Sequence, residues 1–557
     1  MASYCRSVNT DAQLQGYGIQ ACQTIQANSE QGEILNDSTL TLIHGGRVLT
    51  SEGETDRPEP QDILVDGGTI RAVEAGLADE LVQSDGEYAV NGQPIETVID
   101  GRDRLVVPGF VNAHYHSHDV LLKGCFEAIP REAWLLNALP PNYPRRSPEE
   151  IRARTILGAL ECLRSGMTTV QDMLTLNLAH PEDLETVLAA YEEVGIRCVF
   201  AIQTGDVHGA AVTPYWSDVF PEDALPGLSG VVASADTSGI LATLEGQIRG
   251  YSSRSPVLSW GVAPSSPERS SPELLAGLKG ICDRHGVRLF THIYESRATT
   301  VIGRQKFGEW GGSLVDYLDD HGMLGPHVTL AHGVWMRQRE IDRIVERGAS
   351  MVLNPVGNLK TQAGIAPIPE YASSGVELAL GCDNCSCSDA QNMFQAMKAF
   401  AGLAAVSSPE AGGVTALDAF QAATTGGAKA LGLAGTIGAL KPGLQADLTL
   451  LDLSDPSFVP LNSALRQLVF TESGRSVDTV LVNGKVVLRN GRAATVDEVA
   501  LRASVETAME SLRGDIADVV ARNDALAPYM AEAHRLTSHH PLEISRYVPG
   551  LAETDPP

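Results

Sequence analysis

Apolar runs of β type alternate with helical stretches through the middle of the chain. Eight such runs follow one another: LVVPGFVNAHYH (105–116), GMTTVQDM (166–173), GIRCVFAIQT (195–204), VLSWGVAP (257–264), VRLFTHIYE (287–295), VTLAHGVW (328–335), SMVLNPV (350–356) and VELALGCDN (376–384). Helix-compatible residues come after each run, and the stretches 147–166 and 271–286 open with Ser-Pro and end at Gly. This alternation predicts an α/β fold with a parallel sheet, and eight units predict a (β/α)8 barrel with functional groups at the carboxyl ends of its strands.

Hairpin-rich segments flank this alternation at both ends of the chain. TLTLIHGGRVLT (39–50) and DILVDGGTIRAV (62–73) precede it, and ADLTLLDL (446–453) and VDTVLVNGKVVLRNGR (477–492) follow it, with Gly, Asp-Gly and Asn-Gly turn signals. Each segment is too small to bury a sheet face alone. We therefore expect the two to pair into one composite β-sandwich built from N- and C-terminal segments.

These patterns divide the chain into five predicted parts. They are a polar, glutamine-rich arm (1–37), a first sandwich part (38–105), the barrel (106–438), a second sandwich part (439–495), and a C-terminal helix and tail (496–557). In the last part, apolar residues recur at steps of four and three, at Val505, Met509, Leu512, Ile516 and Val519. That spacing predicts an amphipathic helix packed on the barrel or the sandwich.

Composition narrows the class of protein. The chain has 557 residues, 41 Lys+Arg against 69 Asp+Glu, a formal charge of −28, 43% hydrophobic residues and 20% charged residues. This balance is typical of a globular chain, and its negative charge argues against nucleic acid as a partner. Since no signal peptide or membrane span is recognisable, we expect a cytoplasmic protein that acts on a small molecule without a membrane partner. The arm and the C-terminal helix are candidate contacts of a homo-oligomer, a dimer or larger.

Residues that suit a metal site terminate several of the predicted barrel strands. His114 and His116 end the first strand and, being two positions apart, should face the same side. The other strand-end candidates are His292 with Glu295 on the fifth strand, His332 on the sixth and Asp383 on the eighth. Three imidazoles and a carboxylate suit one divalent ion, zinc first, with iron, cobalt or manganese as alternatives.

The order of these residues resembles the amidohydrolase superfamily, in its branch of nucleobase deaminases and triazine hydrolases. The matching stretches are PGFVNAHYH (108–116), GMTTVQDM (166–173), THIYES (291–296), YLDDHGMLGPHVTLAHGVW (317–335), LNPVGNLKTQAGIAPIPEYASSGVELALGCDN (353–384) and LKPGLQADLTLLD (440–452). The resemblance implies the following roles: metal ligands His114, His116, His292 and Asp383, a proton shuttle Glu295, and a residue that polarises the bound water or the developing oxyanion, His332.

The chemistry of these residue types agrees with hydrolysis at an sp² carbon bonded to nitrogen. A divalent ion makes hydroxide available near neutral pH, Asp383 can accept the water proton, and Glu295 can pass a proton to the leaving nitrogen. We expect deamination of an amino-substituted heterocycle. Hydrolysis of an amide, urea, carbamate or carbon–halide bond is the alternative, because the same groups would serve. A non-catalytic scaffold is disfavoured, since every ligand and both proton-handling residues are present.

The metal number can also be argued from the sequence. Two-metal relatives carry a carboxylated lysine at the end of the fourth strand, whereas SWGVAPSSPERS (259–270) contains none, so we expect one metal per chain. Two departures from the family pattern fall at the predicted pocket wall. Gly357 takes the serine position in NPVGN, and Cys382 takes the threonine position before Asp383.

Two further groups of residues are candidates for chemistry or binding. Cys382, Cys385 and Cys387 form a C-x-x-C-x-C pattern whose alternative interpretation is a second zinc or redox site, although no second cysteine pair completes a four-ligand cage. The candidates for substrate contact lie just past strand ends, where barrel loops carry binding residues: His118, His208 and Trp310.

Overall fold

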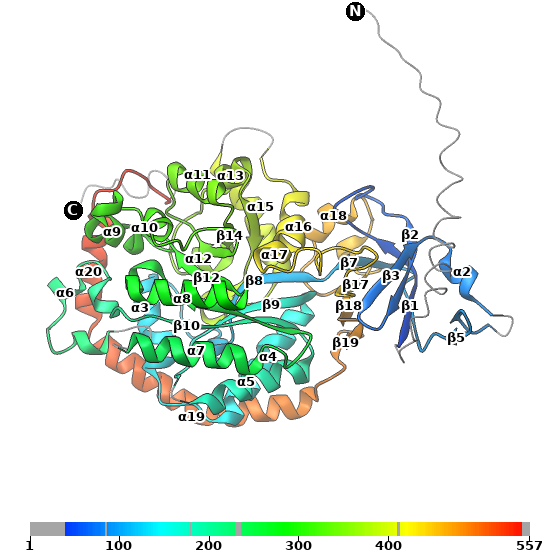
Figure 1. The fold of residues 1–557 in the computed structure, drawn as a ribbon, viewed down its shortest axis with the longest axis horizontal. Helices are drawn as coiled ribbons and strands as arrows, with labels where there is room; N and C mark the ends of the chain where they lie inside the picture. Colours follow the sequence, from blue (N-terminus) through cyan, green and yellow to red (C-terminus); the bar gives the residue numbers. More distant parts are fainter. Residues whose placement is uncertain (1–38, 84–85, 179, 229–235, 409–412, 548–557) are drawn as a thin grey trace, which may run out of the picture.

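The structure is a computed structural model that describes residues 39–83, 86–178, 180–228, 236–408 and 413–547. The predicted arm at 1–37 lies outside the described residues. Figure 1 shows two bodies side by side: a rounded body of strands and helices, and a sheet in which the blue N-terminal strands approach orange-brown strands from late in the chain.

Parallel strands form a closed ring in the first body, and they follow the order of the chain. The eight are β8 (Phe110–His116), β9 (Met167–Leu174), β10 (Arg197–Thr204), β11 (Leu258–Pro264), β12 (Arg288–Ile293), β13 (Val328–His332), β14 (Ser350–Leu353) and β15 (Glu377–Leu380). The short β16 (Asp383–Asn384) continues β15 and pairs with β8, which closes the ring. The predicted (β/α)8 barrel is confirmed.

An apolar cluster occupies the inside of the ring. Side chains from different strands can meet in one cluster only on the inner face that the strands share. The cluster contains Val111, Ala113, Met173, Val199, Ala201, Ala263, Phe290, Val352 and Ala379. The strand ends that carry polar residues therefore project from a packed core, the position in which such barrels present functional groups.

The eighth strand is interrupted where its backbone passes close to two neighbours. A Cβ atom on Gly381 would lie 2.3 Å from Asn354 Oδ1 and 2.8 Å from the Cβ of His114, so only glycine fits there. After this point the chain turns, Asp383 adopts a φ of 62°, and Asp383 pairs with Tyr115 of β8. The interruption thus brings Asp383 to the end of the first barrel strand.

Helices cover the outside of the ring. They include α4 (Pro148–Arg164), α5 (Pro181–Val194), α7 (Thr237–Tyr251), α8 (Pro272–His285), α9 (Arg297–Lys306), α10 (Leu314–Asp320), α11 (Gln338–Arg347), α13 (Ile368–Ser374), α15 (Met393–Ser407), α16 (Ala416–Ala423) and α17 (Thr425–Ala430). Both predicted Ser-Pro starts are confirmed. Ser147 Oγ accepts the Glu150 N–H at 3.2 Å, and Ser271 Oγ accepts the Leu274 N–H at 3.1 Å, as N-cap residues do.

The second body is one nine-stranded sheet made from both ends of the chain. Its strands are, in order, β20 (Arg492–Ala493), β19 (Lys485–Arg489), β18 (Val477–Val482), β17 (Leu448–Asp452), β7 (Arg104–Pro108), β1 (Leu40–Val48), β2 (Pro60–Asp66) and β3 (Thr69–Glu74), and β6 (Thr97–Asp100) pairs with β1. The two ends meet where β17 pairs antiparallel with β7. Both contribute to one apolar core, with Ile43, Ile63 and Val106 against Leu448, Leu450 and Leu481. The predicted composite pairing is confirmed.

The apolar run at 105–116 is two strands rather than one. Its first part, β7, lies in the composite sheet, and its second part, β8, lies in the barrel. The chain changes sheet at Gly109, where a Cβ atom would lie 2.1 Å from Thr168 Oγ1. At this crossing a single residue, Gly109, separates the strand of the composite sheet from the strand of the barrel. The apolar pattern runs through it without a break and so did not indicate the crossing.

Two helices follow the composite sheet. The predicted amphipathic helix is α19 (Glu498–Asp524), and its apolar face, including Val505, Met509 and Leu512, packs against barrel residues such as Trp134. The second, α20 (Ala527–His539), was not predicted. It begins one turn after α19 ends, and Arg297 Nε anchors it by donating to the Thr537 carbonyl at 3.0 Å.

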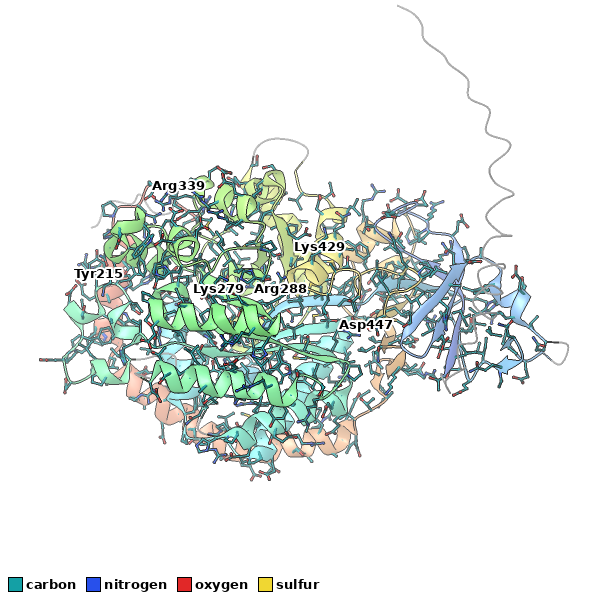
Figure 2. All side chains as sticks on the ribbon, viewed as in Figure 1. Tyr215, Lys279, Arg288, Arg339, Lys429 and Asp447 are labelled. Atoms are coloured by element: carbon teal, nitrogen blue, oxygen red, sulfur yellow. The ribbon has the colours of Figure 1, made fainter. Side chains whose placement is uncertain are left out.

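A buried ion pair links the barrel to the composite sheet. Arg197 at the start of β10 donates from Nε and Nη2 to the Asp447 carboxylate at 2.8 and 3.0 Å, and Asp447 also accepts the Asn483 N–H at 2.7 Å. Figure 2 labels Asp447 at this junction. In the described part of the chain, no helix has the length and apolar character needed to cross a membrane.

Candidate metal centre and active-site cavity

Six polar side chains from four strand ends meet above the barrel core. They are His114 and His116 at the end of β8, His292 near the end of β12 with Glu295 just beyond it, His332 at the end of β13, and Asp383 in β16. All six are at least 92% buried. The sequence pattern placed each at a strand end, and the closed ring of strands brings those ends together.

Four of these residues present donor atoms at nearly equal spacing. His114 Nε2 and His116 Nε2 lie 3.2 Å apart, and His116 Nε2 lies 3.4 Å from His292 Nε2. Asp383 Oδ1 lies 3.5 Å from His114 Nε2 and 3.4 Å from His116 Nε2. Tetrahedral ligands bound at about 2.0–2.1 Å stand about 3.3–3.4 Å from one another, so the spacing fits one small divalent ion.

The hydrogen bonds behind the ligands select their tautomers. His116 Nδ1 contacts the Met173 carbonyl and His292 Nδ1 contacts the Ser265 carbonyl, both at 2.5 Å. A carbonyl only accepts, so both Nδ1 atoms carry hydrogen and both Nε2 atoms present lone pairs. Burial lowers the pKa of His116 to about 3 and also lowers those of His114 and His292, which keeps the rings neutral. Facing lone pairs repel, and a cation between them removes the repulsion.

Asp383 is held in its charged form by its surroundings. Burial alone would raise the pKa of this carboxyl group, but the hydrogen bond to His114 and the neighbouring imidazoles hold it well below its ordinary value. Its second oxygen, Oδ2, lies 3.4 Å from Cys387 Sγ, and the same sulfur lies 3.2 Å from the Asn384 carbonyl oxygen. Gly357 leaves room for this thiol, since a Cβ atom there would lie 3.1 Å from Cys387 Sγ and 3.2 Å from Asp383 Oδ2.

The three clustered cysteines are buried thiols. Burial raises the pKa of Cys382 to about 12 and raises those of Cys385 and Cys387 well above the ordinary value, so thiolates are disfavoured. Among the described residues, the groups that could hold a metal contain histidines and Asp383 but no cysteine. The alternative interpretation as a second zinc or redox site therefore has no support here.

His332 points an unpartnered nitrogen toward the same space. Its Nδ1 contacts Asn358 Oδ1 at 2.9 Å and Asn354 Nδ2 at 3.3 Å, and the shorter contact favours hydrogen on Nδ1. His332 Nε2 is buried and has no hydrogen-bond partner within the described structure. Asn358, in α12 (Pro355–Lys360) after the seventh barrel strand, thus orients His332.

Glu295 is paired with an arginine that sequence reasoning missed. Arg131, the first residue of α3 (Arg131–Ala138), donates from Nε to Glu295 Oε2 at 2.6 Å. The same Glu295 oxygen lies 4.0 Å from His332 Nε2. Burial opposes the charge of Arg131, but the carboxylates around it, Glu295 first, raise the pKa of its guanidinium. Arg131 lies in a long connection with no apolar period, so no pattern signalled it.

A cavity with about 760 Å³ of empty space, part of it open to solvent, lies beside these residues. Its wall includes His116, His292, Glu295, His332 and Asp383. The polar part of the remaining wall is made by Arg131, Glu132, Gln203, Ser265, Ser266, Glu268, Arg269 and Asn384, and the apolar part includes Trp134, Leu139, Val212 and Trp216. Such a lining, with charged, polar and aromatic side chains together, suits a small polar molecule.

The three candidates for substrate contact lie elsewhere. His118 is buried behind His116 and uses both ring nitrogens, toward the Thr175 N–H at 3.3 Å and Asn384 Nδ2 at 3.2 Å. His208 caps a short helical turn through the Ala210 N–H, and Trp310 packs against Tyr317. None of the three is among the described residues that line the cavity.

The end of the fourth barrel strand carries no lysine. β11 ends at Pro264 and is followed by Ser265, Ser266 and the short helix η5 (Pro267–Arg269). Ser265 supports His292 through its carbonyl, and Glu268 lines the cavity. The described residues that could hold a metal fall into two groups that share His114: one with His116 and His292, and one with His332 and Asp383.

Most of the chain is similar to known proteins of one family. A profile of the amidohydrolase family matches residues 105–487. A 5'-deoxyadenosine deaminase from Methanothermobacter thermautotrophicus is 28% identical over 456 residues, which cover 81% of this chain and 97% of that protein. A 5-methylthioadenosine/S-adenosylhomocysteine deaminase from Syntrophobacter fumaroxidans is 30% identical over 463 residues, 83% of this chain and 96% of that protein.

Solved structures resemble the fold over most of its length. An adenosine deaminase from Xanthomonas campestris with bound zinc superposes with a TM-score of 0.72 at 25% identity and covers 85% of this chain and 98% of that one. A triazine hydrolase from Arthrobacter aurescens gives a TM-score of 0.72 at 22% identity, with 85% and 99% covered. At 22% identity, the likeness to the triazine hydrolase shows a shared fold and nothing more.

Proposed function

This chain belongs to the amidohydrolase family and is a hydrolase of carbon–nitrogen bonds, and we propose that it removes the amino group of an adenosine-type nucleoside. The observation that carries the proposal is the meeting of three histidines and a carboxylate with Glu295 and His332 at the wall of one cavity. The curated relatives named above, which are adenosine-type deaminases, support the class of substrate.

The metal in this proposal is one divalent ion per chain, zinc first, with iron, cobalt and manganese as alternatives. His114, His116, His292 and Asp383 would hold it, as the nearly equal spacing of their donor atoms and the neutral tautomers of His116 and His292 favour. When bound, such an ion would lower the pKa of a coordinated water from about 16 toward about 7.

Protein groups around the cavity handle the protons. Asp383, with Oδ1 among the histidine nitrogens, can take a proton from the attacking water. Glu295, on the cavity wall, can pass protons to the substrate nitrogens, a role worth about 10²- to 10⁴-fold in rate. His332 Nε2, which has no partner in the described structure, can accept a hydrogen bond from the attacking water and, once protonated, can donate one to the oxygen that develops charge.

The proposed reaction consumes one water and releases one ammonia. The water oxygen forms a bond to the ring carbon, and the bond from that carbon to the amino nitrogen breaks. One water proton ends on the leaving nitrogen, and the other ends on the adjacent ring nitrogen, so the product carries a carbonyl group beside an N–H. Arg131 keeps the Glu295 carboxylate in place during these transfers.

The alternative reactions differ in their products. Hydrolysis of an amide, urea, carbamate or carbon–halide bond would use the same residues but release an amine, carbon dioxide or halide without ammonia. A non-catalytic scaffold would have no need of the unpartnered His332 nitrogen and the clustered ligands. Self-association and a cytoplasmic location also remain proposals, and they rest on the expectations from sequence.

An ammonia-release assay tests the proposed function. We expect the metal-loaded enzyme to release ammonia from adenosine, 5'-deoxyadenosine or 5'-methylthioadenosine, and not to cleave amides, ureas or aryl halides. Glu295→Gln should lower kcat by about 10²- to 10⁴-fold with unchanged metal content, because the amide cannot carry the proton. Turnover of the contrasting compounds without ammonia from any aminated heterocycle would contradict the proposal.

A further inference from the structure

Glu268 presents an unused hydrogen-bond acceptor at the cavity wall. It lies in η5 after the fourth barrel strand, is only 6% exposed and lines the cavity beside the proposed metal centre. Its backbone N–H and the Ser266 hydroxyl bond to the carboxylate, whereas Oε2 is buried without any hydrogen-bond partner among the described residues. Oε2 is thus the carboxyl oxygen that no donor reaches within the described structure.

The surroundings of Glu268 raise its pKa overall and leave its carboxyl group incompletely hydrogen-bonded. Burial raises the pKa of Glu268, and the nearby charges of Arg131 and Arg269 act in the opposite direction. Neither guanidinium donates a hydrogen bond to Oε2. A buried acceptor without a partner is costly, so such a group at a cavity wall is commonly completed by what enters the cavity.

We propose that Glu268 selects substrates that place a second hydrogen-bond donor, an N–H on the ring or an O–H on the sugar, against its free oxygen. A carboxylate oxygen only accepts, so the complementary group must donate. The amino group that leaves is needed at the metal end of the cavity, beside Glu295 and Asp383. The donor that Glu268 reads is therefore a different group of the same molecule.

This inference rests on the proposed deamination and adds to it a rule for the substrate. A nucleoside that lacks the donor would leave Glu268 Oε2 buried without a partner. A site built around a hydrogen bond discriminates strongly against analogues that cannot make it. From the usual cost of an unsatisfied buried group, we expect about a 10- to 100-fold preference in kcat/KM for the donor-bearing member of a matched pair.

Two matched pairs separate the two sources of the donor. Adenosine against 2',3'-dideoxyadenosine tests sugar hydroxyls, and 2-aminoadenosine against adenosine tests a ring amino group. We expect one pair to show the preference in the wild-type enzyme. In Glu268→Gln, the amide oxygen should keep the Ser266 and backbone donors and turn its NH2 group toward the cavity. The preference shown by that same pair should then fall at least tenfold.

Glu273→Gln is the matched control, because Glu273 lies exposed on α8, five residues further on. It should leave both ratios unchanged. Equal kcat/KM within both pairs for the wild-type enzyme would overturn the inference, and this result does not depend on whether Glu268→Gln folds. A preference that is unchanged in Glu268→Gln would also overturn it. If none of the three compounds released ammonia, the proposed function would be overturned and this inference with it. That result differs from ammonia release with unchanged ratios, which would overturn the inference alone.

Discussion

Cys387 and Gly357 share one small space behind the proposed ligand Asp383. The sulfur lies 3.4 Å from Asp383 Oδ2 and 3.2 Å from the Asn384 carbonyl oxygen, and the missing side chain of Gly357 leaves the volume that the sulfur fills. The family pattern carries serine at the Gly357 position. The departure at Gly357 is therefore linked in space to Cys387, because the thiol of this residue of α14 (Cys385–Ser388) occupies the place that a side chain at 357 would take.

This arrangement predicts a role for Cys387 in metal affinity. Partners that orient a metal ligand are worth about 10- to 100-fold in metal binding, so Cys387→Ala should weaken the metal by that factor and Cys387→Ser should restore part of it. A competition titration with a chromophoric chelator measures the affinity. Cys282→Ala, which removes an equally buried thiol on α8, should leave the metal affinity unchanged. Equal affinities in Cys387→Ala and the wild type would contradict the role.

At this scale, the residues that end strands were the predictable ones. His292, His332 and Asp383 each terminate an apolar run, and a barrel brings such ends together. Arg131 and Glu268 lie in connections without any period, and their importance depends on contacts between segments more than a hundred residues apart. His118 shows the reverse case, because it continues the histidine pattern yet lies behind His116, away from the cavity.

At the scale of elements, the junction between β10 and the composite sheet depends on one ion pair. Arg197 and Asp447 are 5% and 2% exposed, and both guanidinium bonds are at normal hydrogen-bond length. Removing one partner of a buried pair leaves an uncompensated charge, which costs more than the pair contributes. The junction should therefore be sensitive to substitutions of either partner.

Arg197→Met should lower the free energy of unfolding by about 3–5 kcal/mol, because Asp447 would remain charged and buried. Urea denaturation followed by fluorescence gives the measurement. Arg152→Met is the control: its pair with Glu193 is exposed on both sides, so we expect a loss of at most about 1 kcal/mol. A loss of similar size in the two variants would show that the junction does not depend on this pair.

Elements with regular periods were predicted well, and the points where the chain changes direction were not. The barrel strands and the Ser-Pro helices follow from apolar spacing and cap residues. The change of sheet at Gly109 and the interruption at Gly381 depend on contacts with Thr168 and Asn354. Those contacts exist only in the folded molecule. The helix α20 was missed for a similar reason, since α6 (Trp216–Val219) and α9 hold it by tertiary contacts.

At the scale of the whole molecule, the barrel interrupts a sheet whose two halves come from opposite ends of the chain. The sequence could predict this pairing because neither half can bury its apolar face alone, and β7 beside β17 confirms it. The formal charge of −28 is spread over a chain whose proposed site depends on one cation. Local donor atoms, rather than the overall charge, thus determine what the site can bind.

The central claim is that one metal ion in this cluster supports deamination, and a metal titration tests it most directly. Chelated enzyme is given zinc stepwise while ammonia release from an adenosine-type substrate is measured at each step. We predict no ammonia release without metal, and a rate that rises linearly and levels off at one equivalent per chain. A plateau at two equivalents, or full ammonia release from the metal-free enzyme, would contradict the account.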